Sequence, residues 1–431
     1  MLLQRKPKRK NYKVIWTKKQ LRHLANKMNK LEEVAFDTET NTLRVNGPNK
    51  EFKIIGMSIS WGQYDNYYIP MGHLLEDRNQ LSPNRVAKQL KPIFEKEDIR
   101  LIGHNIMFDM HVLSRIGVNV QTKDLWDTMI ASWLIDENLP KGLKDCSARE
   151  LGVDQTRIDE VFSTVTKEEK KMFGLKGNQK ATFDLVKVDV GSPYALDDAF
   201  YTWCLYLHFY DLLEKEKMLN IFDKQYKDFI KTLYEMEEVG VEVDIEKLKK
   251  MGKEMDEDLE ELQYNVFPIC VYCGKDKIFE LSGVEFNPNS NQQLAELLFK
   301  CEDYKNPNKE ILDISFNFPV ISVTAKGMPQ ANNHVLEILA KKEYKDKRKR
   351  EGIALIRLLL EYKKLKKLKT AFVDGLLEEI YDDGRVHPNF NIVGTTSGRI
   401  SCSSPNLNFV GHYSVMNNSK VGEFGEVLQR D

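Results

Sequence analysis

Two acidic residues follow an apolar run near the start of the chain, in the stretch VAFDTETNTL, residues 34–43. The apolar residues are β-prone, and on a strand the two-residue period sends the side chains of Asp37 and Glu39 to the same face. Two carboxylates held side by side repel each other and are costly to bury without a counter-charge. The pair therefore predicts a bound cation.

Two further acids occur beside predicted element boundaries. In GHNIMFDMHVL a strand is predicted to end at Asn105, and Asp109 falls in the first turn of the following helix. In YALDDAFYT, Tyr194 and Asp198 are four residues apart, which places both on one face of a helix. Carboxylate oxygens suit Mg²⁺ or Mn²⁺. Two such ions about 4 Å apart can activate a water and stabilise the leaving oxygen of a phosphodiester.

Each motif alone has a simpler interpretation. An acid-x-acid triplet on a strand is usually two polar residues on a solvated face, and a tyrosine four residues before an aspartate is usually helix surface. The order in which all of them occur, rather than any single one, favours a catalytic site.

The first half of the chain supplies the elements that position these acids. Strands are predicted in EEVAFDTE, FKIIGMSISWG, NYYIPM and IRLIGHN, with a helix in NRVAKQLKPIFEKE. Helices then dominate, in FDMHVLSRIG, LWDTMIASWLIDE and LKDCSARELG, and in a longer one near GSPYALDDAF with Pro193 in its first turn. Strands followed by covering helices predict an α/β domain over residues 31–215.

The second half is predicted to be mostly helical. One amphipathic helix stops at Gly240, a shorter one in SNQQLAELLFK has Ser290 as its N-cap, and the longest begins at IALIRLLLEYKK. The glycine-, serine- and asparagine-rich end, residues 409–431, is predicted to be a flexible tail.

Composition bounds the class of protein. The 431 residues allow about two or three domains, and a formal net charge of -1 means that a nucleic-acid surface needs local segregation of charge. Six scattered cysteines fit a reducing compartment, and no apolar run approaches the roughly 18 residues of a membrane span. The basic segment 1–30 lacks the apolar core of a signal peptide; a solvated start is favoured over a nuclear address or a nucleic-acid arm. A cytoplasmic protein with no membrane partner is expected.

The stretches FDTET, HNIMFD and YALDDAFYT resemble the three motifs of the DnaQ-like (DEDD) 3′–5′ exonucleases, and the third resembles their DEDDy branch. The resemblance covers about 180 residues and implies an RNase H-like fold with a mixed sheet. It also implies that two divalent ions, Mg²⁺ or Mn²⁺, are held by Asp37, Glu39, Asp109 and Asp198.

The same resemblance assigns roles beside the metal ligands. Tyr194 would orient the attacking water together with Glu39. Asn105 would contact the substrate, and Phe108 would pack near the terminal nucleotides, although Phe108 is equally well explained as core.

The remainder resembles the start of a family A DNA polymerase domain, in YEMEEVGVEVD, FNPNSNQQLAELLF, TAKGMPQANNHVLEIL and LLEYKKLKKLKTAFVDGLLEEI. GRVHPNFNIVGTTSGRISCSSPNLN resembles the strand and loop that lead into the palm, where the family has T-x-T-G-R and this chain has Ser397 for the second threonine, which keeps the hydroxyl. Residues 216–408 would then be a mostly helical thumb fragment.

The resemblance ends at about Asn408, where FVGHYSVMNNS stands in place of the first palm aspartate. Phosphoryl transfer onto a primer needs two palm acids, so polymerase activity is not expected from this chain alone. The layout resembles a truncated or split phage-type polymerase, whose separate palm-and-fingers chain would be a partner. Another interpretation is that the residues after Asn408 come from reading past an interruption in the gene.

DNA contacts are predicted at Lys363, Lys366 and Lys367, within a lysine cluster that is about as well explained by a solvated helix face. Arg399, in TTSGRIS, is placed to grip a phosphate, and Lys326 is a weaker candidate.

Cys270 and Cys273 have the spacing of half a zinc knuckle. A structural zinc site needs about four ligands, and Cys301 is the nearest further candidate, so absence of zinc is favoured. His104 is interpreted as structural.

The sequence thus predicts a proofreading 3′–5′ exonuclease that releases nucleoside monophosphates from DNA 3′ ends, single-stranded or in a primer-template duplex. The alternative is a DNA-binding accessory subunit of a split polymerase with little nuclease activity of its own.

Overall fold

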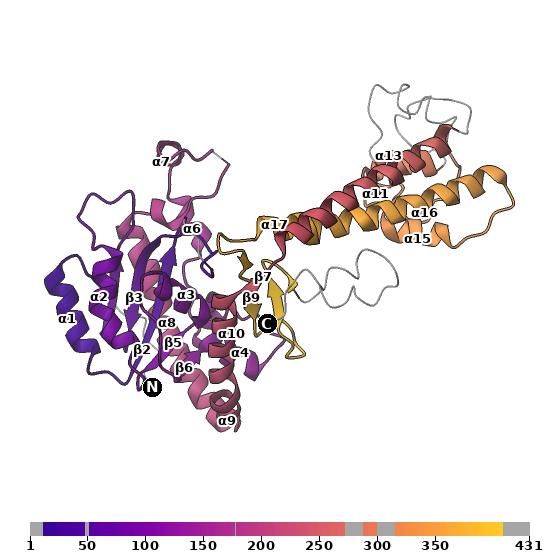
Figure 1. The fold of residues 1–431 in the computed structure, drawn as a ribbon. Coiled ribbons are helices and arrows are strands. Elements are labelled where there is room, and N and C mark those ends of the chain that lie inside the picture. Colours follow the sequence, from indigo (N-terminus) through magenta and orange to yellow (C-terminus); the bar gives the residue numbers. More distant parts are fainter. Residues whose placement is uncertain (1–11, 48–50, 177, 272–287, 300–314, 408–431) are drawn as a thin grey trace. The chain divides into compact units, whose positions relative to one another are not determined.

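The structure is a computed structural model that describes residues 12–47, 51–176, 178–271, 288–299 and 315–407 (Figure 1). The described chain forms two compact units. The first contains the residues up to Glu242 together with those from Ile380 onward, and the second is Val243–Glu379. The α/β class with a mixed sheet and a mostly helical second part, predicted from the sequence, is confirmed.

A six-stranded mixed sheet is the centre of the first unit, with the strand order β1-β4-β3-β2-β5-β6. Strand β2 lies inside the sheet, antiparallel to β3 and parallel to β5. Because both edges of β2 are hydrogen-bonded, side chains on it are held at fixed positions. The strands are β1 (Tyr12–Val14), β2 (Glu33–Thr40), β3 (Ile54–Ser60), β4 (Asn66–Pro70), β5 (Arg100–Gly103) and β6 (Leu125–Asp127).

Helices cover this sheet, and the long helix α8 (Val188–Lys215) packs against five of its strands. All seven residues of β3 are buried, as expected for a strand covered on both faces. The other helices are α1 (Lys18–Met28), α2 (Pro83–Phe94), α3 (Ile106–Arg115), α4 (Thr128–Ile135), α5 (Leu143–Leu151), α6 (Ile158–Ser163), α7 (Lys167–Met172), α9 (Leu219–Ile221) and α10 (Lys227–Val239), with a short 3₁₀ turn η2 (Phe183–Leu185).

Residues 12–28 are part of this fold rather than only a basic lead-in. Strand β1 pairs in parallel with β4, and α1 begins at a capping box of Thr17 and Gln20. Leu21, Leu24 and Met28 lie on the buried face of α1. The sequence analysis missed these elements because β1 is short and only four of the eleven residues of α1 are apolar.

Two local predictions were wrong. LWD, residues 125–127, forms the edge strand β6 and not the start of a helix; α4 begins after Asp127, whose side chain accepts a hydrogen bond from the backbone N–H of Met129 at 2.8 Å. Pro193 lies inside α8 and not in its first turn, because the helix already begins at Val188 after the extended residue Lys187.

The last described residues return to the first unit. Helix α10 ends at Gly240, as predicted, with φ of 68°. The next strand β7 (Val241–Glu242) pairs with β8 (Arg385–Val386), and β9 (Asn389–Asn391) pairs with β10 (Ser401–Ser403). Buried Ile392 and Val393 join the core of the sheet domain. Part of the predicted polymerase segment therefore packs with the exonuclease-like domain.

Helices build the second unit, in which α11 (Ile245–Val271) packs along α16 (Lys347–Leu368) (Figure 1). Ser290 caps α13 (Asn291–Leu298) as predicted, by accepting a hydrogen bond from the backbone N–H of Gln293. Phe316 and Phe318 lie in the core formed by α13, α15 (Asn333–Ala340) and α16. The unit also contains α17 (Gly375–Glu378). Among the described residues, no helix is long and apolar enough to cross a membrane.

Candidate active site

Three of the four predicted acids meet beside the central strand. Asp37 and Glu39 lie on β2, Asp198 lies on α8, and carboxylate oxygens of the three lie within 4.8 Å of one another. Asp198 is buried, and the other two are half-buried. The two-residue period of β2 and the packing of α8 on the sheet thus bring together residues about 160 positions apart in sequence.

Gly56 makes room for a tyrosine beside this cluster. It pairs with Glu39 across β2 and β3, and a Cβ atom at Gly56 would lie 1.9 Å from the hydroxyl of Tyr68. The Tyr68 hydroxyl is hydrogen-bonded to Nε2 of His73 at 2.7 Å. Burial raises the pKa of Tyr68, and the charges of Glu39 and Asp37 raise it further, so the phenol stays neutral.

Asp109 is adjacent to the cluster but is not one of the three acids that meet within 4.8 Å. Its Oδ1 accepts hydrogen bonds from the backbone N–H of Thr38 at 2.8 Å and from the Thr38 hydroxyl at 2.6 Å. The residue between the two β2 acids therefore ties helix α3 to the strand. After burial, the charge of Asp37 is the next largest cause of the raised pKa of Asp109.

The electrostatics of the cluster fit a bound cation. Burial raises the pKa of Asp37 to about 7, with the nearby Lys144 charge opposing the rise. Burial and the charge of Asp37 raise the pKa of Glu39 well above its ordinary value. Full ionisation at neutral pH therefore needs more positive charge, and divalent cations that prefer oxygen ligands would supply it.

Lys144, on α5, also belongs to this site, and the sequence analysis did not identify it. Its Nζ forms an ion pair with Asp198 and lies 4.3 Å from the ring centroid of Tyr194. Gln155, buried, accepts a hydrogen bond from this Nζ at 3.0 Å. Burial lowers the pKa of Lys144 to about 8, although Asp37 and Glu39 act in the opposite direction. The only sequence signal was its place in GLKDCSARELG, between the second and third motifs.

Tyr194 lies one helical turn before Asp198 on α8, as predicted. Its ring centroid is 6.0 Å from that of Phe183. Burial raises its pKa, and the charges of Glu39 and Asp37 add to the rise, so its hydroxyl remains a hydrogen-bond donor.

A cavity of about 350 Å³ adjoins the N-terminal end of α3. Asn105, exposed and in the left-handed conformation at φ 65°, caps α3, and its backbone N–H donates to Asp127 at 3.1 Å. Phe108 is half-buried. Both line the cavity, as do Leu43, Met129, Phe390 and Asn391. The two predicted substrate contacts therefore share one cavity, and residues of β9 form part of its wall.

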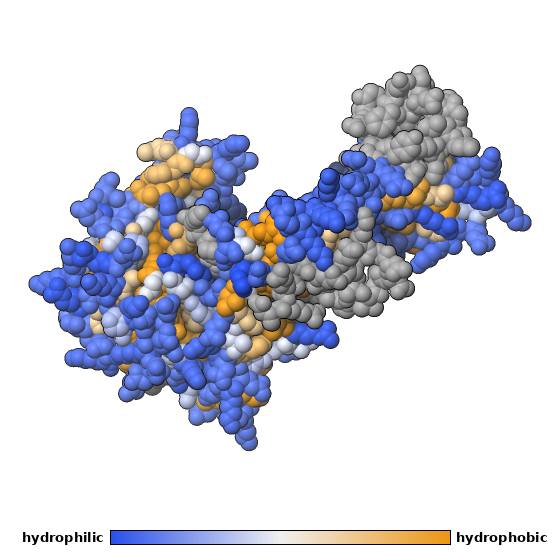
Figure 2. Space-filling view, in the orientation of Figure 1, coloured by the Kyte–Doolittle hydropathy of each residue, from blue (hydrophilic) through white to orange (hydrophobic). Residues whose placement is uncertain are grey.

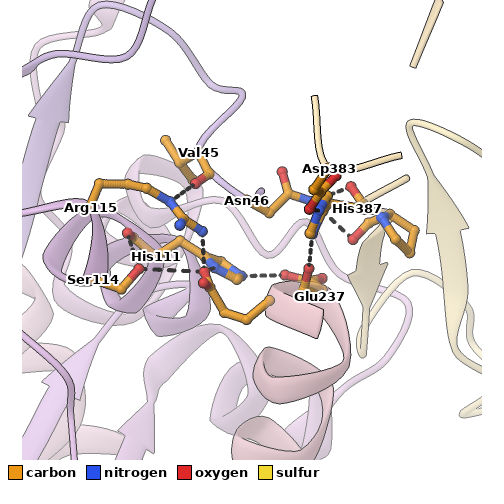
Figure 3. Close-up of polar contacts among 10 residues, drawn as sticks. Val45, Asn46, His111, Ser114, Arg115, Glu237, Asp383 and His387 are labelled. Atoms are coloured by element: carbon orange, nitrogen blue, oxygen red, sulfur yellow. Dashed lines mark hydrogen bonds and ion pairs between the residues drawn. The ribbon is translucent and has the colours of Figure 1, made fainter. Parts of the chain in front are cut away.

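A buried polar network holds that wall in place (Figure 3). His111 of α3 donates to Glu237 of α10 at 2.5 Å, and its other ring nitrogen donates to Glu238. The other carboxylate oxygen of Glu237 accepts from the backbone N–H of Phe390 at 2.5 Å. His387 donates to the Glu237 carbonyl at 2.7 Å. One glutamate thus joins α3, α10 and the β8–β9 segment.

The network extends to the loop that follows β2 (Figure 3). Arg115 pairs with Glu238, and its Nε donates to the carbonyl of Val45 at 2.9 Å. Asn46 donates to the carbonyl of His387 at 2.5 Å. The loop, α3 and the β8–β9 segment are therefore fixed together around the cavity.

The other predicted residues differ in setting. In the second unit, Lys366 and Lys367 are exposed, whereas Lys363 is half-buried and burial lowers its pKa. Arg399 is exposed in a turn of the first unit, as predicted. His104 contacts the hydroxyl of Thr128 at 2.9 Å, in line with a structural role. The prediction about zinc at Cys270 and Cys273 lies outside the described residues, because the structure describes neither the Cys270 side chain nor Cys273.

The mixed sheet with its covering helices is the RNase H-like fold of exonucleases. Residues 12–214 match the family model described as 3′–5′ exonuclease, and residues 245–420 match the model described as DNA polymerase family A. The chain therefore carries a segment that matches a 3′–5′ exonuclease domain, followed by a segment that matches part of a family A DNA polymerase domain. The second match continues past Asn408.

Several relatives agree with these two matches. DNA polymerase I of Borreliella burgdorferi is 28% identical over 92% of this chain and 37% of its own length. The DNA polymerases of Escherichia phage T5 and Bacillus phage SP01 are 27% and 26% identical, over 86% and 90% of this chain. They are covered over 39% and 44% of their lengths, so the chain spans about two fifths of these relatives.

A solved structure shares the fold. It is the polymerase domain of Pol1 from M. smegmatis in complex with DNA primer-template and dNTP. The TM-score is 0.63 at 17% identity, over 96% of this chain and 58% of that one.

Proposed function

We propose that this chain is a divalent-metal-dependent 3′–5′ exonuclease that removes nucleoside monophosphates from DNA 3′ ends, as the proofreading part of a replicative polymerase. The observation that carries the proposal is the convergence of Asp37, Glu39 and Asp198 within 4.8 Å in a domain that matches the 3′–5′ exonuclease model. In that role the protein would act on DNA in the cytoplasm of a bacterium or of a phage-infected cell.

Asp37, Glu39, Asp109 and Asp198 would hold two Mg²⁺ or Mn²⁺ ions. Bound there, the ions would supply an activated water and stabilise the leaving oxygen. Tyr194 would donate its hydroxyl hydrogen to orient the water, with Glu39 accepting from it. Lys144, paired with Asp198 and lying over the Tyr194 ring, would hold both side chains in position and lower the pKa of the two β2 acids.

The cavity beside α3 would take the end of the DNA strand. Asn105 offers an exposed amide for hydrogen bonds to a base or sugar, and Phe108 offers an aromatic surface. The cavity and Asp109 share helix α3, so a strand bound there would lie next to the acids.

Removal of one acid tests this assignment. Asp37→Ala is expected to abolish degradation of single-stranded DNA while DNA binding persists, and excess chelator should abolish it in the parent protein. Asp154→Ala, which changes an exposed aspartate on a loop, is the matched control and should keep parental activity. If Asp37→Ala degrades DNA at the parental rate, the site assignment is wrong.

A second role is favoured by the match of residues 245–420 to the polymerase model: the chain would act as a DNA-binding accessory subunit of a split polymerase. It predicts that adding a separate polypeptide with palm and fingers gives primer extension that neither chain shows alone, including with Asp37→Ala. Absence of extension in the mixture would rule this role out.

A further inference from the structure

The tip of the α6–α7 segment exposes apolar side chains. Met172, the last residue of α7, is 74% exposed, and Phe173 is 40% exposed. Apolar residues gather over α7, at the upper edge of the first unit in this view (Figure 2). Large apolar side chains exposed together are a feature of interaction sites.

Hydrogen bonds hold this tip in a defined conformation. Thr166 and Glu169 form a capping box at the start of α7. After the helix, the backbone N–H groups of Phe173 and Leu175 both donate to the carbonyl of Lys170, at 3.2 and 3.0 Å. Gly174 between them has φ of 77°, which a residue with a side chain rarely adopts. Phe173 is therefore presented to solvent by an ordered turn.

Positive charge surrounds the apolar tip. Residues 167–180 contain five lysines and two glutamates, in a chain whose net charge is -1. One of the glutamates, Glu169, is already paired with Lys187 at 2.9 Å. Among the described residues, Lys171 and Lys176 are exposed and form no ion pair. The tip thus combines unpaired positive charge with an aromatic and a thioether side chain.

The base of the same segment packs against the candidate active site. Leu175, Phe162 and Phe183 belong to one apolar cluster with Tyr194. Lys187, the partner of Glu169, is the N-cap of α8, seven residues before Tyr194. At 1.5 Å per residue, α7 is anchored about 10 Å from Tyr194 along the helix axis. A DNA strand that ends at the acids would need to extend only a few nucleotides to reach the segment.

We propose that the α7 tip, formed by Met172, Phe173, Lys171 and Lys176, binds single-stranded DNA a few nucleotides from the 3′ end that enters the exonuclease site. The inference rests on the proposed nuclease function. Bases stack on exposed aromatic side chains irrespective of sequence, and lysines beside them neutralise the phosphates. Both kinds of group are present at the tip. The 3′ end of the same strand would lie at the acid cluster.

Binding to fluorescently labelled oligothymidylate, measured by anisotropy in excess chelator, tests the inference without any reaction. The double substitution Met172→Ser and Phe173→Ser is expected to weaken binding of an oligomer of about twelve nucleotides by about tenfold. It should change binding of an oligomer of about three nucleotides much less. Met236→Ser, at a methionine 48% exposed on α10, is the matched control and should change neither.

The charge component has its own measurement. Lys171→Gln with Lys176→Gln should lower the slope of log affinity against log salt concentration by about 1.4, because each phosphate contact on a single strand contributes about 0.7. Lys88→Gln, on the exposed face of α2, should leave the slope unchanged.

The outcomes separate this inference from the proposed function. If the α7 variants bind both oligomers like the parent, the inference is overturned, whether or not the chain degrades DNA. If they instead lose binding to anionic lipid vesicles or self-association while DNA binding persists, the tip has a different partner and the inference fails. If the parent binds as expected but never degrades DNA with Mg²⁺ or Mn²⁺, the nuclease proposal fails and the binding surface remains.

Discussion

In the acid cluster, the positive charge that lowers the pKa of both β2 acids belongs to Lys144. The acids must lose their protons to bind cations, so Lys144 favours the metal-binding form while it also pairs with Asp198. Its position against Tyr194 gives it a second effect, on the residue proposed to orient the water. These contacts lead to a prediction about pH.

Lys144→Met is expected to raise the pKa of Asp37 and Glu39 and so to move the acid limb of the pH–rate profile upward by about one pH unit. The rate at neutral pH should fall by about tenfold, which corresponds to that shift. Lys144→Arg keeps the charge and should restore the position of the acid limb. Lys141→Met, whose Nζ donates to the Glu137 carbonyl, is the control. An unchanged acid limb in Lys144→Met would contradict the electrostatic role.

At this scale the sequence predicted the acids and Tyr194 because their spacing is local and repeats a known pattern. It could not reveal Lys144, since α5 and α8 bring Lys144 and Asp198 together from positions 54 apart in sequence. A lysine in a helix, one of 64 lysines and arginines, carries no local sign of such a partner.

Helix α3 carries Asp109 and begins beside the cavity. Charged side chains of α10 hold it through His111. Both ring nitrogens of His111 donate to carboxylates, which is possible only for the protonated imidazole. The hydrogen bonds to Glu237 and Glu238 raise the pKa of His111 against the opposing effect of burial. The pairing therefore stabilises the fold through a titratable group.

The stabilisation by His111 should depend on pH. Because its pKa is raised in the folded state, its contribution is complete below the unfolded value, about 6.5, and is lost as pH rises through the folded value. The difference in unfolding free energy between the parent and His111→Gln is thus expected to shrink as pH rises above about 6.5. Denaturant unfolding across this range measures it. A difference that stays constant or grows with pH would show that His111 is neutral in the fold.

Glu237→Ala tests the same network through the cavity. It leaves Nε2 of His111 and the backbone N–H of Phe390 without their acceptor, which should cost about 3 kcal/mol of stability. It should also raise KM for single-stranded DNA more than it lowers kcat, because the cavity wall loosens while the acids stay. Glu235→Ala, two residues earlier and exposed, is the control. Equal effects of both substitutions on KM would exclude a positioning role for Glu237.

At the scale of elements, the sequence predicted well where the periodicity was strong, as in β2, β3 and α10. It failed at β1 and α1, whose few apolar residues gain their meaning only from the sheet they pack against. Residues 380–393 were assigned to the polymerase part, and the polymerase model also matches them. Their core contacts and hydrogen bonds nevertheless include α3 and α10, which the sequence did not indicate. Such long-range pairing leaves no local periodic signal.

For the molecule as a whole the net charge is only -1, yet lysines are concentrated on α16 and just after it. The structure divides that cluster. Lys369 is paired with Asp256 and Asp374, at 3.2 and 2.9 Å, and Lys363 is half-buried. Lys366 and Lys367 remain exposed. Sequence could not make this division, because Asp256 lies on α11, more than a hundred residues before its partner.

The exposed pair should therefore supply the duplex contacts of the second unit. Lys366→Gln with Lys367→Gln is expected to lower the salt slope of primer-template binding by about 1.8, since each phosphate contact on duplex DNA contributes about 0.9. Lys363→Gln should lower it less. The adjacent exposed lysines Lys18 and Lys19 of α1 give a control with the same change in net charge. If both double variants lower the slope equally, general charge explains binding and the cluster is a solvated helix face; a difference between them assigns the duplex contact to α16.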